Sequence, residues 1–176
     1  VLRGGMKPGR ELTGTSGDNE KRTSRALFDW LNRMFRFDYD AAATHMNALL
    51  PEYSTIEGTF RQQHGIAQIL QPSVEQISEC DGLTLPWLNR RVFVNPPYGR
   101  GLFQAFAQKM VAERSRAEII VGLVKWDTST EVARLLTHYC DVWTLPRVHY
   151  EGEVYAATFA SAIVIPRPTI PKEVLR

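Results

Sequence analysis

The sequence places Asn95, Pro96, Pro97 and Tyr98 together, directly after the apolar run RVFV and shortly before a stretch with helical periodicity. These residue types suit a reaction at an amino group attached to a flat aromatic ring. The lone pair of such a nitrogen is delocalised into the ring, which makes it a poor nucleophile. Two hydrogen-bond acceptors aimed at its N–H bonds would hold the nitrogen toward an electrophile and stabilise the positive charge that develops.

Each member of this quartet has a role in such chemistry. The side-chain oxygen of Asn95 supplies one acceptor, and the backbone carbonyl of Pro96 supplies the other. Pro96 and Pro97 have a fixed φ and no N–H, so the carbonyl is held stiffly. Tyr98 can stack on the ring, and stacking of an aromatic side chain on a base contributes about 1–3 kcal/mol. The alternative is a plain turn with a packed tyrosine, but the strand before the quartet and the helix after it favour a site.

The elements around the quartet alternate between strand and helix. Apolar runs predict strands at 90–94 and 117–124, and helical periodicity predicts helices at 102–114 and 126–139. This alternation indicates a βαβ unit in an α/β sheet. In such sheets ligands bind outside the carboxyl ends of the strands, which is where the quartet stands.

The end of the chain predicts two more strands, at 140–145 and 157–165, with no helix between them. We expect these strands to pair antiparallel. Just before them, Thr128 and Glu131 have the spacing of a capping box at the start of a helix.

The first half of the chain has one clear helix. The run RTSRALFDWLNRMFRF is amphipathic, and Thr23 or Ser24 can cap its start. The run FDYDAAAT then predicts a short strand followed by a turn of small residues. Residues 45–58 are expected to form a loop with a helical turn, and residues 59–79 a short helix and a strand.

Length and composition favour one domain of an ordinary globular protein. The chain has 176 residues, 44% of them hydrophobic, and a formal net charge of +2. We expect a single domain over 22–170, with a possible insertion at 54–79, after a flexible polar tail at 1–21. The net charge by itself does not establish nucleic-acid binding.

Composition also argues against a membrane span and a metal. No apolar run approaches the roughly 18–20 residues of a transmembrane helix. The two cysteines, Cys80 and Cys140, form no CxxC motif, and the pair His138 and Cys140 has no further ligand cluster beside it. We therefore expect no metal and a reducing cytoplasmic location. The oligomeric state is open.

Four stretches in this order resemble the phage-type Dam family of DNA N6-adenine methyltransferases, which use S-adenosylmethionine. They are RTSRALFDWLNRMFRFDYDAAATHMNAL, VFVNPPYG, GLVKWDTS and LPRVHYEGEVYAATFASAIVI. The resemblance implies methyl transfer from S-adenosyl-L-methionine to the N6 amino group of adenine in DNA, with the base flipped into the pocket of the quartet. It also implies a Rossmann-like class I methyltransferase sheet, mostly parallel with a terminal antiparallel hairpin, and helices on both faces.

The resemblance assigns the catalytic role to the quartet and implies a set of cofactor-binding residues. That set is Thr23, Phe28, Asp40, Ala41, Ala42, Ala43, Asn47 and Asp81. Small side chains let a backbone approach a ligand closely. Other interpretations stay open: Asp40 and Asp81 also fit solvated positions in a strand end and a turn. Asn47 fits a turn cap and Phe28 fits core packing. The family has Thr-Pro where this chain has Thr23 and Ser24.

The target strand needs cations near the mouth of the pocket. The candidates for contacts with DNA phosphates are Arg100, Lys125, Arg147 and His149. Each also fits a plain surface charge, and Trp126 fits either base stacking or packing. The segment 54–79 could read DNA, cover the cofactor, or do neither.

Three alternatives to DNA methylation remain. The same chemistry serves enzymes that methylate an RNA base or a protein amide. A decayed nucleic-acid-binding module would keep the fold without turnover. The intact quartet argues against decay, whereas the departure at Thr23 and Ser24 argues mildly for it.

Overall fold

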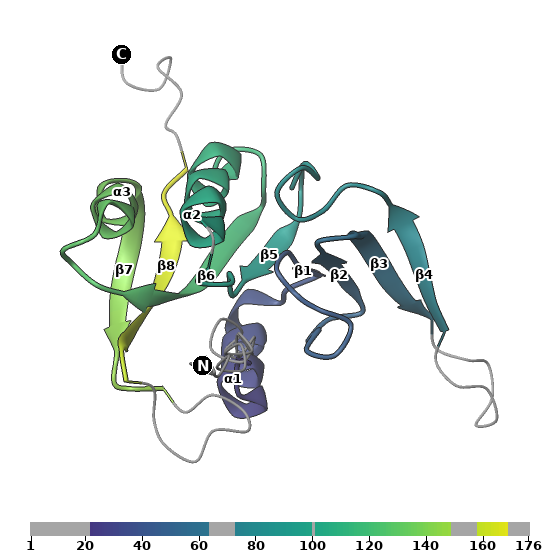
Figure 1. The fold of residues 1–176 in the computed structure, drawn as a ribbon, viewed down its shortest axis with the longest axis horizontal. Helices are drawn as coiled ribbons and strands as arrows, with labels where there is room; N and C mark the ends of the chain where they lie inside the picture. The colour runs from purple at the N-terminus through teal and green to yellow at the C-terminus, as the bar shows by residue number, and fades with distance from the viewer. Residues whose placement is uncertain (1–21, 64–72, 100, 149–157, 169–176) are drawn as a thin grey trace, which may run out of the picture.

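The computed structural model describes residues 22–63, 73–99, 101–148 and 158–168 (Figure 1). These residues form three helices and eight strands, and all eight strands belong to one sheet. The elements are α1 (Arg25–Phe35), β1 (Tyr39–Asp40), β2 (Glu52–Thr55), β3 (Gly58–Gln63), β4 (Ser73–Ser78), β5 (Arg91–Val94), α2 (Leu102–Glu113), β6 (Ile119–Trp126), α3 (Glu131–Tyr139), β7 (Cys140–Leu145) and β8 (Ala160–Pro166).

The strand order is β4-β3-β2-β1-β5-β6-β8-β7. The four central strands run parallel: β1 pairs with β2 and with β5, and β5 pairs with β6. The strands on both flanks run antiparallel, through the pairs β2–β3, β3–β4, β6–β8 and β7–β8. The predicted antiparallel pairing of the last two strands is therefore confirmed.

The prediction of a mostly parallel, Rossmann-like sheet is wrong, because four of the seven strand pairings are antiparallel. The main cause is the segment 52–78, which forms three strands where a loop with a helical turn, a short helix and a single strand were expected. These strands fold back on one another, and β3 begins at Gly58, which directly follows the turn and has a φ of 141°. A Cβ there would lie 2.4 Å from the backbone oxygen of Ser78, so this position requires glycine. The second cause is β8, which enters between β6 and β7.

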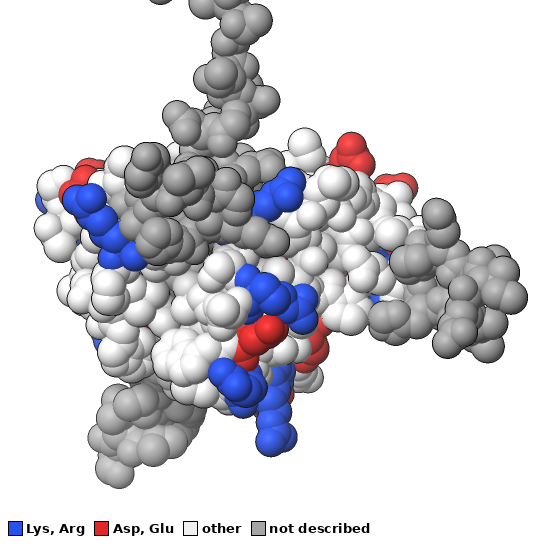
Figure 2. Space-filling view, turned by 90° about the horizontal axis from the view of Figure 1, so that it is seen from below, with Lys and Arg blue, Asp and Glu red and all other residues white. Residues whose placement is uncertain are grey.

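The sheet lies between two helical layers, with α1 on one face and α2 and α3 on the other (Figure 1). The side chains of β5 alternate accordingly. Val92 and Val94 pack in one apolar cluster with Phe106 of α2, while Phe93 packs in another with Phe28 of α1. Figure 2 looks onto the α1 side and shows Lys and Arg side chains gathered over that helix.

The contacts of α1 fix its direction relative to β5. At its end, the carbonyls of Phe35 and Arg36 accept from Nε of Arg91 at 2.7 and 3.1 Å, and Arg91 begins β5. Two turns earlier, the ring of Phe28 lies edge-on to Phe93 with centroids 5.2 Å apart. The helix is thus antiparallel to β5, and its N-terminus points toward the carboxyl end of that strand.

Two helix starts test the predicted caps. Ser24 caps α1, since its hydroxyl accepts from the backbone N–H of Leu27. For α3 the predicted cap Thr128 is wrong. The hydroxyl of Thr130 accepts from the backbone N–H of Ala133 at 3.1 Å and takes that position.

Candidate functional site

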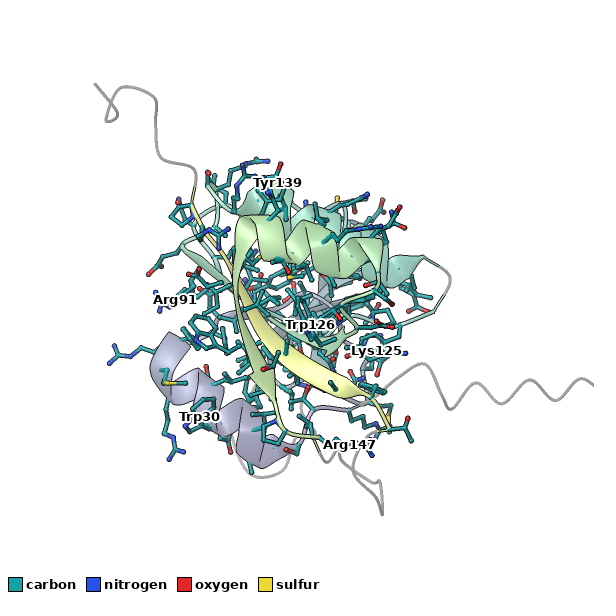
Figure 3. The ribbon with its side chains drawn as sticks, turned by 90° about the vertical axis from the view of Figure 1, so that its left-hand side faces the viewer. Trp30, Arg91, Lys125, Trp126, Tyr139 and Arg147 are labelled. Atoms are coloured by element: carbon teal, nitrogen blue, oxygen red, sulfur yellow. The ribbon has the colours of Figure 1, made fainter. Side chains whose placement is uncertain are left out.

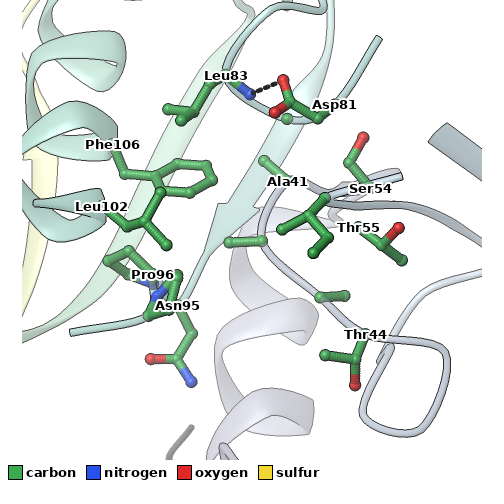
Figure 4. A pocket seen from close by; sticks show the side chains of 15 residues that line it. Ala41, Thr44, Ser54, Thr55, Asp81, Leu83, Asn95, Pro96, Leu102 and Phe106 are labelled. Carbon is green, nitrogen blue, oxygen red and sulfur yellow. Dashed lines mark hydrogen bonds between the residues drawn. The ribbon is translucent and has the colours of Figure 1, made fainter. Parts of the chain in front are cut away.

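A pocket of about 150 Å³ lies at the carboxyl ends of β2, β1 and β5 (Figure 4). An apolar cavity of about this volume can hold a single six-membered ring. The pocket is built from four separate stretches and the start of α2. Its lining consists of residues 41–44, 54–56, 81–83 and 95–97, with Leu102 and Phe106.

Topology explains why a crevice forms here. β1 and β5 are neighbours and run parallel, but the chain leaves them in opposite directions. After β1 it goes to β2 on one side, and after β5 it passes through α2 to β6 on the other. The two connecting loops diverge at this point, which is the position where open α/β sheets bind ligands.

The floor of the pocket depends on a close backbone approach at Gly82. A Cβ on this residue would lie 1.8 Å from the carbonyl oxygen of Ala41. The indole Nε1 of Trp87, which is fully buried, donates to the carbonyl of Gly82 at 3.1 Å and holds it there. Gly82 therefore joins the loop after β1 to the loop that carries Asp81.

Asp81 lines the pocket and also shapes its own turn. Its Oδ1 accepts from the backbone N–H groups of Leu83 and Thr84 at 3.1 and 2.9 Å, and from the Thr84 hydroxyl at 2.7 Å. Its Oδ2 has no hydrogen-bond partner among the described residues. The turn and ligand-binding interpretations of Asp81 are thus compatible, with one oxygen for each.

A buried chain of hydroxyls connects the sheet to this part of the pocket. The Thr59 hydroxyl donates to the carbonyl of Cys80 at 2.7 Å, and it lies 2.6 Å from the Ser54 hydroxyl, which lies 2.5 Å from the Tyr39 hydroxyl. A carbonyl can only accept, so every proton in the chain points toward Cys80, from Tyr39 through Ser54 and Thr59. Burial raises the pKa of Tyr39 to about 12, so its hydroxyl stays a donor.

Asp40 lies behind the pocket wall and is not part of the lining. It is buried, and its two oxygens accept from the backbone N–H groups of Ala42 at 3.4 Å and Leu49 at 3.3 Å. Burial raises the pKa of Asp40 to about 6, although these hydrogen bonds oppose the shift. Asn47 also works within the loop, because its Oδ1 accepts from the N–H of Thr44 at 2.6 Å. Both residues shape the loop that presents Ala41, Ala42 and Ala43 to the pocket.

The two residues predicted at the start of α1 differ in their surroundings. Phe28 is 1% exposed and packs among Phe37 and Phe93, which is a core position. Thr23 is 3% exposed, and its Oγ1 has no hydrogen-bond partner among the described residues. A buried unpaired hydroxyl costs about 1–3 kcal/mol. Because α1 runs antiparallel to β5, this hydroxyl lies toward the edge of the sheet where Asn95 stands.

The quartet divides between the pocket and its rim. Asn95, Pro96 and Pro97 line the pocket, whereas Tyr98 lies outside the lining. The Tyr98 ring is edge-on to Phe103 at 5.6 Å and to Phe159 at 5.7 Å. Its hydroxyl donates to Oδ1 of Asn95 at 3.4 Å, which is a long hydrogen bond.

Two of the predicted DNA-binding residues, Lys125 and Arg147, lie at the same end of the sheet. Ser161 of β8 pairs with Lys125 on one side and with Leu145 on the other, so Arg147 follows at the same edge (Figure 3). Both cations are exposed, and Nζ of Lys125 lies 5.3 Å from the ring centroid of Phe159, which contacts Tyr98.

Three further predictions concern residues near this edge. Arg100 and His149 lie outside the described residues. Trp126 packs against the core cluster of α2 and α3, which supports packing as its role.

Within the described ranges, no group of three or more His, Cys, Asp or Glu side chains could hold a metal. Cys140 is buried, and burial raises the pKa of its thiol to about 12. No helix in these ranges is long and apolar enough to cross a bilayer.

Part of the lining was missed in the sequence. Gly82 and Thr44 directly follow predicted site residues, and Leu102 and Phe106 stand four apart at the start of the helix after the quartet. These neighbours could have been found from the motifs. Residues 54–56 carry no comparable signal, because their place depends on the pairing of β2 with β1.

No protein-family model matches this chain, and no curated protein matches it. Its function must therefore be inferred from the residues and their geometry.

Proposed function

We propose that this chain transfers a methyl group from S-adenosyl-L-methionine to the N6 amino group of adenine in DNA. One observation supports this most. Asn95 and Pro96 line the same pocket as the alanine loop 41–43 and Asp81, although more than fifty residues separate the alanines from Asn95 in the sequence. The residues of the acceptor pair and of the expected cofactor loop thus line a common cavity.

The residues around the pocket suit the cofactor by their chemistry. Three alanines allow close backbone approach, and Asp81 keeps a carboxylate oxygen without a partner in the described part of the chain. The Thr23 hydroxyl, buried and unpaired there, lies toward the same edge. When bound, S-adenosylmethionine supplies an electrophilic methyl group to a nitrogen nucleophile.

The chain's own contribution is to position the amino group. Asn95 Oδ1 and the Pro96 carbonyl each accept one N–H bond, which points the nitrogen lone pair into the pocket and stabilises the charge that forms on it. Tyr98 donates to Asn95 Oδ1 and is itself held by two phenylalanine rings. This arrangement fixes the acceptor before the substrate arrives, and it makes Tyr98 a positioning residue as well as a candidate for stacking.

The decisive experiment is methyl transfer from labelled S-adenosylmethionine to unmethylated DNA, followed by mass spectrometry of the nucleosides. We expect an N6-methyladenine nucleoside with the wild type, formed about 10²–10³-fold more slowly with Asn95→Ala. Gln104→Ala is the matched control, because Gln104 is exposed on α2 and does not line the pocket. Cofactor binding without a methylated DNA base would direct the search to RNA and protein amides. Absence of both would favour a nucleic-acid-binding module without turnover.

A further inference from the structure

We infer that the outer face of α1 is a contact surface for the phosphate backbone of the DNA that flanks the target base. This inference rests on the proposed function in one respect, since it takes DNA as the substrate that reaches the pocket. The surface, called here the α1 surface, consists of the exposed side chains of Arg22, Arg25, Trp30, Arg33, Met34 and Arg36.

Helical spacing gathers the members that belong to α1 on one side, and Arg22 and Arg36 flank the helix. α1 buries Phe28 and Leu31 against the sheet, at 1% and 0% exposure. Positions three and four residues apart lie over one another on a helix, so Trp30, Arg33 and Met34 form a row on the opposite side. Figure 2 shows this face with its basic side chains toward the viewer.

The charge on this surface is positive, and most of it has no carboxylate partner in the part of the chain that the structure describes. Residues 22–36 contain four arginines and one acidic residue, Asp29, which pairs with Arg25 at 2.9 Å. The guanidinium groups of Arg22, Arg33 and Arg36 have no carboxylate partner within the described residues.

Two exposed arginines elsewhere on the molecule do have such partners. Arg61 pairs with Glu52 at 2.9 Å, and Arg134 lies 3.7 Å from Glu131. Exposed arginines that lack carboxylate partners among the described residues attract a polyanion by charge complementarity.

The apolar members of the surface distinguish nucleic acid from a lipid bilayer. Trp30 is 46% exposed and Met34 is 50% exposed. An interfacial membrane helix inserts a whole apolar face, but the apolar face of α1 is already buried in the core. A single half-exposed tryptophan among arginines suits contact with sugars or bases beside phosphates.

The α1 surface adjoins the site through the end of β7. Leu145 and Val148 pack in the same apolar cluster as Phe28 and Leu31 of α1. Arg147 stands between them in the chain, at the edge that also carries Lys125 (Figure 3). Basic side chains thus extend from the rim of the pocket to the outer face of α1.

Salt-dependent binding of a labelled DNA duplex tests the inference. The variant is Arg33→Gln with Arg36→Gln, and the matched control is Arg61→Gln with Arg134→Gln, which removes the same charge from other exposed positions. Each lost phosphate contact lowers the slope of log K against log salt by about 0.9. We expect the α1 variant to lower the slope by about 2 and the control to leave it near the wild-type value. Trp30→Phe should also abolish part of the tryptophan fluorescence change on DNA binding.

Several results would overturn the inference. Equal slopes for the two double variants would show that overall charge decides, with no role for this face. No DNA binding by the wild type, or binding to anionic vesicles in its place, would also refute it. Methyl transfer separates these failures from failure of the proposed function, because a wild type that methylates DNA with unchanged slopes in the α1 variant refutes only the contact surface. Conversely, a lowered slope in the α1 variant without any methyl transfer would support the contact surface and refute the proposed activity.

Discussion

The two sides of the pocket edge differ in charge and in attachment. Residues 51–81, the acidic flank, contain five carboxylates and one arginine and form β2, β3 and β4. The α1 surface carries four arginines and one aspartate. The acidic flank is joined to the pocket by the buried hydroxyl chain that ends at Cys80, and Gly82, which directly follows the flank, packs against Ala41. The side chains of the α1 surface are exposed. The difference indicates that one side builds the pocket and the other is available to a polyanion.

The charge of the acidic flank also bears on the segment 54–79, for which DNA reading was one expectation. Its described carboxylates include Glu57 and Glu75, and Arg61 is engaged by Glu52. Burial alone would raise the pKa of Glu52, but hydrogen bonds and charges from Arg61 and Arg90 lower it overall. Phosphate contacts are therefore favoured on the α1 side.

The largest effect should come from removing the acceptor in the pocket while both sides stay intact. Asn95→Ala should lower kcat about 10²–10³-fold, the range seen when one preorganised charge-stabilising group is lost. DNA affinity and its salt dependence should stay at wild-type values. Single-turnover kinetics and duplex binding, measured on the same preparation, check both halves.

The α1 variant should behave in the opposite way. Arg33→Gln with Arg36→Gln should weaken binding to long duplexes with little change in kcat.

Asn95→Asp keeps a side-chain acceptor and should retain more turnover than Asn95→Ala. Turnover at the wild-type rate in Asn95→Ala would refute the role of Asn95 as a hydrogen-bond acceptor in the reaction.

The next prediction concerns the stability of the folded protein. Gly82→Ala inserts a methyl group against a backbone carbonyl that cannot move as a side chain can, and it should cost about 3 kcal/mol, the upper part of the usual range for overpacking. Gly101→Ala is the control: its φ of 75° is left-handed, but nothing lies within 4 Å, so only about 1–2 kcal/mol of backbone strain is expected. Urea denaturation measures both, and Arg33→Gln should stay within about 0.5 kcal/mol of the wild type. A smaller loss for Gly82→Ala than for Gly101→Ala would contradict the close approach.

Local patterns predicted the elements around the quartet well. The run RVFV formed β5, and the periodic stretches after it formed α2, β6 and α3. The segment 52–78 failed because its strands are mostly polar, as in SVEQIS, and are stabilised by pairing with one another. Parallel and antiparallel pairing depends on such long-range partners, and no local period encodes them. This is why the fold class was wrong although many elements were right.

The site shows the same limit at the level of single residues. Asn95 and Pro96 were found because their types are unusual where they stand, whereas Asp81 was predicted only from the family resemblance. The sequence could not tell that Asp40 lies behind the wall, since one step along a loop decides whether a side chain faces in or out. Nor could it show that Tyr98 contacts Phe159, which is 61 positions away in the sequence.

The buried carboxyl group of Asp40 also predicts that the stability of the fold depends on pH. Burial raises the pKa of Asp40 from an ordinary 3.8 to about 6, so the folded protein holds a proton there that the unfolded chain releases. The stability from this group is full below about pH 4 and is lost as pH rises through 6, by up to about 3 kcal/mol. Between acidic and neutral pH, the unfolding free energy of the wild type should fall by up to about 3 kcal/mol more than that of Asp40→Asn. An identical pH profile for the wild type and Asp40→Asn would show that Asp40 does not titrate in this range.

The smallest effect tests the hydroxyl chain that joins β3 to the segment of Asp81. Thr59→Val keeps the shape of the side chain but leaves the Cys80 carbonyl without its donor and the Ser54 hydroxyl without its acceptor, at a cost of about 1–3 kcal/mol. Thr144→Val on the exposed side of β7 should change stability by less than about 0.5 kcal/mol. Ser54→Ala breaks the same chain one step earlier, so the double variant with Thr59→Val should cost less than the two single losses together. Strict additivity would mean that the two hydroxyls act separately, and the acidic flank would then be held to the pocket mainly by Gly82.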